Sequence, residues 1–308
     1  MSIPGLPASG HRTSPFLGTA DDLVILDADI GWRPGGLIAL AIAARVVPNL
    51  VVVTADETHG RRAQLARHAL NLLDRTDVRV IAGFDLGGED RFLLDNHHRS
   101  PAFSEDFLER IRGLDRMIAA IVELCETTRR IRWVGLGPMS NITAVVSRLP
   151  EIADRVMVTQ LGGALNHHHG KTPVSHNFRV DPVSAGLALR ALHTPRLVRG
   201  EHTDSDATQI TPGFPLLPTF EQPTAPGWAQ LLAIHLRAWL VREPRTWLGH
   251  PLALSATLGL PFVTFRTERI EIHPDARLSR TPHGRPMQVS NTVDYPAFLT
   301  WMRDALRI

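Results

Sequence analysis

The chain has 308 residues, of which 44% are hydrophobic and 21% are charged, and its formal net charge is +2. This composition excludes a disordered or collagen-like chain, and basic and acidic residues alternate without forming a patch for nucleic acid or a membrane surface. The single cysteine, Cys125, cannot form an internal disulfide, so we expect a protein of the reducing cytoplasm. No stretch reaches the roughly 20 apolar residues of a membrane span, and residues 1–20 lack the pattern of a signal peptide.

Short apolar runs alternate with helical stretches along most of the chain. Residues 1–21 are rich in Pro, Gly and Ser and are expected to form a flexible arm, whereas residues 22–308 are expected to form one domain. Six apolar runs predict buried strands at 23–27, 49–54, 78–83, 132–137, 155–162 and 195–200. Helical spacing predicts helices between them at 35–47, 61–74, 103–127, 140–149 and 181–192. This order predicts an α/β fold with a mostly parallel, doubly wound sheet flanked by helices.

After residue 200 the regular alternation is lost. The sequence predicts helices at 228–242, 251–260 and 297–306, and a pair of β-like segments at 262–272 and 287–291. In a doubly wound sheet, ligands bind outside the carboxyl ends of the strands. The segments that follow the predicted strands are therefore the ones expected to carry a site, and several of them are rich in Asp, His and Asn.

The first of these segments is LDADIGWRPGG, at 26–36. Asp27 and Asp29 end a predicted buried strand, where carboxylates can hold a metal ion, bind sugar hydroxyls or act as a base. The alternative is that an aspartate at this point only caps the next helix.

Two further segments place polar residues where a predicted strand turns into a helix. In GLGPMSNITAVVSRLPEIADRV, at 135–156, Ser140 and Asn141 stand at the helix start, where free backbone N–H groups can meet a polar ligand. In VSHNFRVDPVSAGLAL, at 174–189, Asn177 could donate to a hydroxyl, and Asp181 followed by Pro182 is typical of a helix N-terminus.

In this order and spacing, the three segments resemble the nucleoside hydrolase family of inosine- and uridine-preferring N-ribohydrolases. The family carries DxDxGxDD after its first strand, a GPLTN-type turn near mid-chain, and EFN…DPEAA after an MGG. The corresponding residues here are DADIGWRP at 27–34, GPMSN at 137–141, and GG at 162–163 followed by Asn177 and DP at 181–182. HPLA at 250–253 matches the family's HDPLA segment, and the resemblance covers about residues 22–306.

The resemblance implies a single nucleoside-hydrolase-like domain that cleaves the N-glycosidic bond of ribonucleosides. Family members bind one calcium ion, which holds the ribose 2′- and 3′-hydroxyls and a water molecule. An aspartate of the first motif takes a proton from that water, which then attacks the anomeric carbon. Asp29 matches this general base, and Asp27 matches the aspartate before it. The resemblance also implies a homo-oligomer, either a dimer or a tetramer.

The calcium ligands of the family are largely replaced in this sequence. Arg33 and Pro34 stand where the family has an aspartate pair, of which the first grips ribose and the second is a principal calcium ligand. His250 replaces the C-terminal aspartate ligand, so Asp29 and the backbone carbonyl of Leu136 are the ligands that remain. Because Ca²⁺ requires six to eight oxygen ligands, we predict no calcium here and no other cofactor.

The first hypothesis for the activity is a calcium-independent enzyme that acts on a nucleoside or a related N-glycoside. Asp29 would be the base, Arg33 and Asn177 would hold the sugar, and a histidine would protonate the leaving base. We place His59 and His202 with the catalytic candidates, and both follow predicted strands. The residues expected to contact the substrate are Asp27, Trp32, His98, His176, Asn177 and His250.

Two alternatives remain open. Zn²⁺ or Fe²⁺ could replace calcium, because an aspartate with histidines suits these ions. Such an ion would be held by Asp29 and His250 with the Leu136 carbonyl, and by His59 or His176. The chain could also be a pseudoenzyme that binds a nucleoside-like ligand or a protein partner without turnover. Trp32 could stack on a base or sugar, or only fill the space that calcium occupies in the family.

Overall fold

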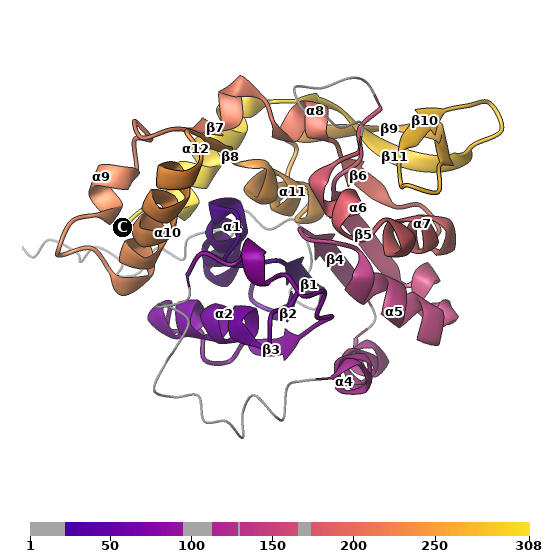
Figure 1. The fold of residues 1–308 in the computed structure, drawn as a ribbon, viewed down its shortest axis with the longest axis horizontal. Helices are drawn as coiled ribbons and strands as arrows, with labels where there is room; N and C mark the ends of the chain where they lie inside the picture. Colours follow the sequence, from indigo (N-terminus) through magenta and orange to yellow (C-terminus); the bar gives the residue numbers. More distant parts are fainter. Residues whose placement is uncertain (1–21, 95–112, 129, 166–173) are drawn as a thin grey trace, which may run out of the picture.

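The computed structural model of this protein describes residues 22–94, 113–128, 130–165 and 174–308. At its centre is a nine-stranded sheet in the order β10-β9-β11-β6-β5-β4-β1-β2-β3 (Figure 1). Strands β1 to β6 run parallel to one another, as the sequence predicts for its six apolar runs. Their bounds are β1 Leu23–Ala28, β2 Leu50–Thr54, β3 Arg79–Ala82, β4 Ile131–Gly135, β5 Val156–Leu161 and β6 Arg196–Val198.

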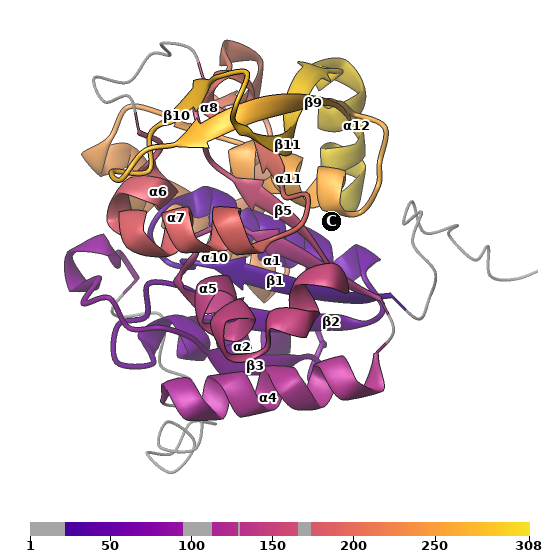
Figure 2. The same ribbon diagram turned by 90° about the vertical axis from the view of Figure 1, so that its right-hand side faces the viewer.

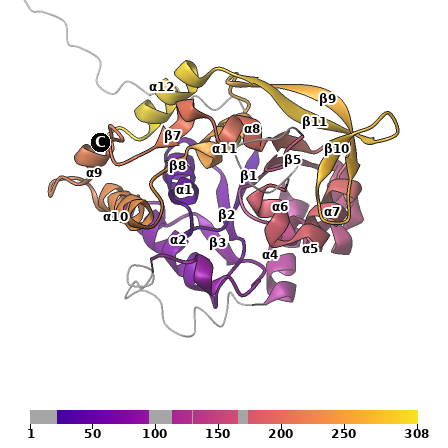
Figure 3. The same ribbon diagram turned by 45° about the horizontal axis from the view of Figure 1, so that its top comes forward.

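The C-terminal third of the chain extends the sheet past β6. Strand β11 (Arg285–Val293) pairs parallel with β6 and antiparallel with β9 (Val263–Ile272), which in turn pairs with β10 (Leu278–Arg280). Figures 1 and 3 show these strands continuing beyond one edge of the parallel strands. The sequence predicted the β9–β11 pair but not that it would join the main sheet. A separate ribbon pairs β7 (Gln209–Ile210) with β8 (Thr246–Trp247).

Helices cover both faces of the sheet because each central strand is buried on both sides. On β1, Val24 and Leu26 belong to one hydrophobic cluster, whereas Leu23 and Ile25 belong to another. The first cluster holds α1 (Pro34–Val46), α2 (Arg61–Leu72), α10 (Gly227–Arg242), α11 (Gly249–Thr257) and α12 (Tyr295–Ala305). The second holds α4 (Leu114–Thr127), α5 (Ser140–Arg148) and α7 (Pro182–Ala191), which lie over one face in Figure 2.

Several short helices in the connections were not predicted. They are α6 (His176–Val180), α8 (Gly200–Thr203), α9 (Leu217–Phe220) and 3₁₀ turns at Glu89–Arg91, Pro150–Asp154 and Asp206–Thr208. The helix predicted at 103–127 is described only from Leu114 onward, as α4, and the predicted arm at 1–21 lies outside the described residues. Among the helices that the structure describes, none is long and apolar enough to cross a membrane.

The strand order reverses between β1 and β4, and this reversal positions the site. In open α/β sheets, the crevice at such a reversal is where ligands bind. The loops after β1 and β4 touch there, because Gly137 has no side chain. A Cβ at Gly137 would lie 2.8 Å from Cβ of Ala55 and 3.2 Å from the backbone nitrogen of Asp29.

Candidate active site

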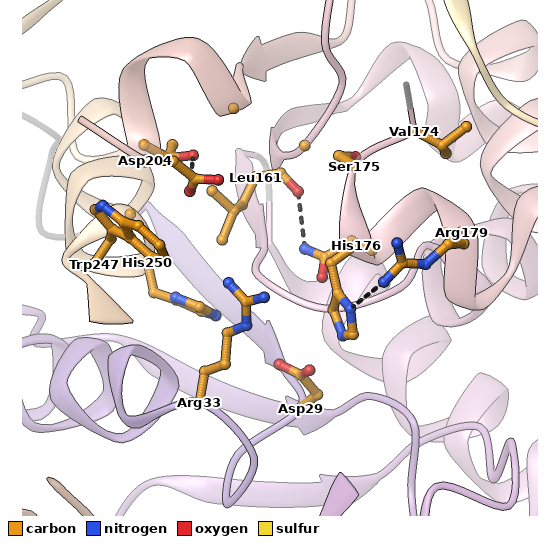
Figure 4. Close-up of a pocket in the computed structure, with 15 residues that line it drawn as sticks. Asp29, Arg33, Leu161, Val174, Ser175, His176, Arg179, Asp204, Trp247 and His250 are labelled. Atoms are coloured by element: carbon orange, nitrogen blue, oxygen red, sulfur yellow. Dashed lines mark hydrogen bonds between the residues drawn. The ribbon is translucent and has the colours of Figure 1, made fainter. Parts of the chain in front are cut away.

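A cavity of about 310 Å³ opens where the parallel strands end, beside residues that follow β1, β5 and β6. Its size is at the lower end of the roughly 300–1,000 Å³ that small-molecule sites occupy. Figure 4 shows side chains from the ends of these strands and from the first turns of α6 and α11 directed into this space. The ionisable residues that line it are Asp29, Arg33, His176, Arg179, Asp204 and His250.

Asp29 follows the last residue of β1 and lines the cavity, although only 4% of its surface is exposed. Burial raises the pKa of its carboxyl to about 6, and the neighbouring charge of Asp56 adds to this increase, whereas Arg62 and Arg33 oppose it. In the described part of the chain, no other side chain forms a hydrogen bond with this carboxyl group. A carboxylate with this pKa is mostly ionised at neutral pH and can accept a proton from water.

Arg62, on α2, fixes the loop that carries Asp29. Its side chain is completely buried, and Nη1 donates to the backbone carbonyls of Asp29 and Ile30, each at 3.0 Å. Its Nη2 lies 3.2 Å from Oδ2 of the buried Asp56, which also pairs with Arg91. The sequence analysis did not single out Arg62, because an arginine in a helix gives no sign that it is buried.

Asp27, on β1, does not line this cavity. Its Oδ1 accepts from Nδ2 of Asn141 at 2.7 Å, and its Oδ2 accepts from Nε1 of Trp133 at 3.2 Å. Burial raises the pKa of Asp27 to about 7, although both hydrogen bonds oppose the increase. Asn141 is itself fully buried and also donates to the carbonyl of Thr54. The expected contact of Asp27 with substrate therefore has no support in the structure.

Asn177 connects the ends of two strands beneath the cavity. Its Nδ2 donates to the carbonyls of Leu136 and Leu161, each at 2.9 Å. These bonds fix the orientation of the amide, and its Oδ1 is left to accept from a ligand in the cavity that Asn177 lines. The carbonyl of Leu136, which the resemblance offered as a calcium ligand, already accepts this hydrogen bond.

His176, the first residue of α6, contributes an unpaired nitrogen. Nη2 of Arg179 lies 3.5 Å from its Nδ1, while its Nε2 is buried and has no hydrogen-bond partner among the described residues. Burial, followed by the charges of Arg33 and Arg179, lowers the pKa of His176 to about 3. The ring is therefore neutral at physiological pH, and its contact with Arg179 favours a proton on Nε2.

His250 lies in the first turn of α11 and is packed against the first turn of α1. A Cβ at Gly35 would lie 2.4 Å from its Nδ1, so the ring occupies the space that any other residue at position 35 would need. Burial, followed by the charge of Arg33, lowers the pKa of His250 to about 3. This imidazole is neutral as well.

Arg33 is the N-cap residue of α1 and reaches into the centre of the cavity (Figure 4). Its Nε is buried without a hydrogen-bond partner among the described residues, and its guanidinium carbon lies 5.7 Å from the ring centroid of Trp239. Across the described residues, no ion pair within 4.0 Å joins Arg33 to Asp29 or Asp204. A fixed positive charge therefore stands where the resemblance places a carboxylate.

Three other predicted site residues lie away from the cavity lining. His59 is exposed, and its Nε2 pairs with Glu89 at 2.7 Å. His202 places its Nδ1 2.7 Å from Oγ of Ser290 on β11. Trp32 packs edge-to-face on Trp239, with ring centroids 5.3 Å apart, so here it fills space between helices. His98 lies outside the described residues.

The residues around the cavity do not suit a calcium ion. Asp29 and Asp204 are the carboxylates that line it, whereas a guanidinium and two imidazoles occupy much of the remaining lining. Calcium requires six to eight oxygen ligands, and the charge of Arg33 would repel it. Nowhere in the described ranges do three His, Cys, Asp or Glu side chains gather as a metal site. Of the residues offered for zinc or iron, Asp29, His176 and His250 line the cavity without forming such a group, whereas His59 pairs with Glu89.

Comparison with protein families decides which family this fold represents. The model of the family described as inosine-uridine preferring nucleoside hydrolase matches residues 24–299. The chain belongs to this family. Membership confirms the resemblance that the three sequence segments indicated.

Curated relatives and solved structures are similar to the chain at low identity. A pyrimidine-specific ribonucleoside hydrolase, RihA of Escherichia coli strain SMS-3-5, is 23% identical over 176 residues, which cover 54% of this chain and 57% of that protein. The match thus spans little more than half the length of this relative.

The structural likeness is more extensive and confirms the nucleoside hydrolase fold. A plant nucleoside hydrolase has a TM-score of 0.72 at 19% identity, covering 93% of this chain and 99% of that one. A purine-preferring ribonucleoside hydrolase from Gardnerella vaginalis has a TM-score of 0.70 at 18% identity, covering 92% and 97%. The type III effector XopQ, solved with adenosine diphosphate ribose, has a TM-score of 0.69 at 16% identity, covering 92% of each chain.

Proposed function

We propose that this protein hydrolyses the N-glycosidic bond of a nucleoside or a related N-glycoside without a bound calcium ion. The observation that carries the proposal is Asp29, a buried carboxyl group that faces the cavity and whose pKa of about 6 leaves it mostly ionised at neutral pH. It stands at the position of the family's general base. The family match over residues 24–299 supports the type of bond that is cleaved.

The chemistry assigned to each residue follows from its position. Asp29 takes a proton from a water molecule, the water oxygen bonds to the anomeric carbon, and the bond from that carbon to the leaving nitrogen breaks. The electron pair stays with the leaving nitrogen, which takes up a proton from solvent. Oδ1 of Asn177 accepts from a sugar hydroxyl and orients the ring. His59 and His202 receive no role in this scheme, because they do not line the cavity.

Release of free sugar from a panel of purine and pyrimidine ribonucleosides, measured in EDTA, tests the proposal. We expect turnover that survives EDTA and falls by about 100-fold or more in Asp29→Asn, the usual range for loss of a general base. Asp304→Asn is the matched control, since this exposed carboxyl on α12 is remote from the cavity. Turnover that appears only with added Ca²⁺ would contradict the calcium-free mechanism, and binding without any turnover would favour the pseudoenzyme.

We further propose that the protein works in the cytoplasm as a dimer or tetramer. The support is a single buried cysteine, which suits a reducing compartment, together with the family resemblance. Light scattering coupled to size-exclusion chromatography tests the assembly, and a molar mass equal to that of one 34.0 kDa chain would overturn it.

A further inference from the structure

Residues of the cavity wall carry nitrogen donors that have nothing to bind in the described part of the protein. Nε of Arg33 and Nε2 of His176 are both buried and have no hydrogen-bond partner among the described residues. His250 is 7% exposed and forms no hydrogen bond with them either. Buried polar groups are almost always satisfied in native proteins. These three side chains therefore indicate a ligand that is rich in acceptor oxygens.

The backbone adds positive charge at the same place. Arg33 is the N-cap residue of α1, although a helix N-terminus favours an acceptor or an anion and disfavours a cation. Helix α11 begins beside it with Gly249 and His250, which line the cavity. Neither helix has an acidic residue in its first turn or a side-chain cap. A guanidinium and two helix N-termini repel one another in the free protein, and a bound anion relieves this repulsion.

The position of the acidic side chains restricts where an anion can bind. Asp204 lines the cavity on the side opposite His176 and Arg179, and it would repel an anion placed beside it (Figure 4). On the other side, Arg33, Arg179, Arg91 and Arg62 all lower the pKa of His176 by their charge, because this part of the cavity has a positive potential. Asp29 lies below the gap between Arg33 and His176 and would also repel an anion beside its carboxyl group (Figure 4). The favourable place is therefore between the guanidinium of Arg33 and the pair formed by His176 and Arg179, on the side away from Asp29.

We propose that the substrate is an anionic N-riboside, whose phosphate or carboxylate group is bound by Arg33 together with Arg179 and His176. The inference rests on the proposed function, since it names the substrate class of the same cavity. Breaking the N-glycosidic bond leaves positive charge on the sugar, which the fixed charge of Arg33 opposes. An anion paired with Arg33 cancels that opposition, whereas a neutral nucleoside supplies nothing to do so.

Binding tests the inference independently of turnover. The unmodified protein is titrated with ribose and ribose 5-phosphate, which have no N-glycosidic bond, and the Asp29→Asn protein is titrated with the nucleosides. Calorimetric titrations compare ribose with ribose 5-phosphate, and compare uridine and inosine with their 2′-, 3′- and 5′-monophosphates and 5′-carboxylates. We expect at least one anionic ligand to bind tenfold or more tightly than its neutral partner. Arg33→Gln should abolish this preference and Arg33→Lys should keep part of it, because charge is retained while the planar donors are lost. Arg303→Gln, an exposed arginine on α12, is the control.

The arms of the experiment separate the outcomes. A preference for monophosphates identifies phosphate as the anion, and a preference for 5′-carboxylates identifies a carboxylate. The inference is overturned when no anionic ligand binds more tightly than its neutral partner, or when the preference survives in Arg33→Gln. Tight anion binding without sugar release by the unmodified protein would refute the proposed function alone. Hydrolysis of neutral nucleosides with no anion preference would refute this inference alone.

Discussion

Replacing Arg62 with methionine is the perturbation whose effect the structure defines most fully. The arginine is completely buried, donates to the carbonyls of Asp29 and Ile30, and pairs with the buried Asp56. Removing one partner of a buried ion pair costs about 3–5 kcal/mol, because the other charge is left without compensation. Here Arg91 still pairs with Asp56, so we expect a loss of about 3 kcal/mol in the free energy of unfolding.

The assay is urea denaturation of Arg62→Met, followed by fluorescence and by circular dichroism. Arg237→Met is the control, because Arg237 forms an exposed ion pair with Glu221 and should leave the denaturation midpoint unchanged. Arg62→Lys should restore part of the stability, since it keeps the charge but loses the planar set of donors. A loss of less than about 1 kcal/mol in Arg62→Met would refute the view that this arginine organises the loop.

Arg62→Met should also change the pH dependence of activity, which gives a second and independent test. Arg62 is the strongest of the charges that lower the pKa of Asp29. The base must be ionised, so activity falls as the pH falls through the pKa of Asp29, which is about 6. Without Arg62 this pKa rises, and the acid limb of the activity profile should move to higher pH. A purely structural role would lower activity at every pH and leave the limb where it is.

Three further predictions concern Asp27, Gly35 and Arg33. Burial raises the pKa of Asp27 from 3.8 to about 7, so ionising it destabilises the fold progressively as the pH rises across that interval. In urea denaturation, the free energy of unfolding of Asp27→Asn relative to the unmodified protein should be higher at pH 7 than at pH 4.5, by on the order of 2–4 kcal/mol. An equal difference at both pH values would contradict this. Gly35→Ala would place a methyl carbon 2.4 Å from Nδ1 of His250 and should therefore reduce kcat/KM. Gly36→Ala is the control, because its methyl carbon would meet no described atom nearer than 3.8 Å. Equal activities of the two variants would refute the steric reasoning. Without ligand, Arg33→Gln should melt at the same temperature as the unmodified protein or higher, since it removes a cation from a helix N-terminus; a clear decrease would indicate a structural role for Arg33.

The parallel part of the fold follows from the sequence because β1 to β6 are apolar runs separated by amphipathic helices. The edge formed by β9, β10 and β11 was less predictable. On β9, exposed and half-buried residues predominate, so its pattern shows a strand but not the partner that it joins. The pairing of β11 with β6 brings together residues about 90 positions apart, which local patterns do not record.

The site was predictable where a residue directly follows a strand in the middle of the sheet. Asp29 fulfils this condition and lines the cavity. Asn177 lines it as well, although it stands on α6 rather than directly after a strand. Asp27 does not line it, and its carboxyl group is bound by Asn141 and Trp133 instead. His59 lies in the loop after β2, nearer the sheet edge, where its backbone is left-handed (φ 54°). Its side chain pairs with Glu89 and not with the cavity residues.

Residues that reach the cavity from the remaining connections gave weaker signals. Arg179 and Asp204 lie in or next to segments that follow predicted strands, but nothing local distinguished them from surface charges. Trp247 comes from the short strand β8, which only the folded chain brings to the cavity. Arg33 was recognised as a departure from the family pattern, yet its role as an N-cap cation with an unpaired buried nitrogen required the structure.

The central claim is that Asp29 supports hydrolysis without calcium. The most direct test is the initial rate of sugar release by metal-free protein in EDTA, compared with the rate in millimolar Ca²⁺, with Asp29→Asn measured in both buffers. The account predicts equal rates for the unmodified protein in the two buffers and a loss of about 100-fold or more in the variant. A rate that appears only when Ca²⁺ is added would contradict it.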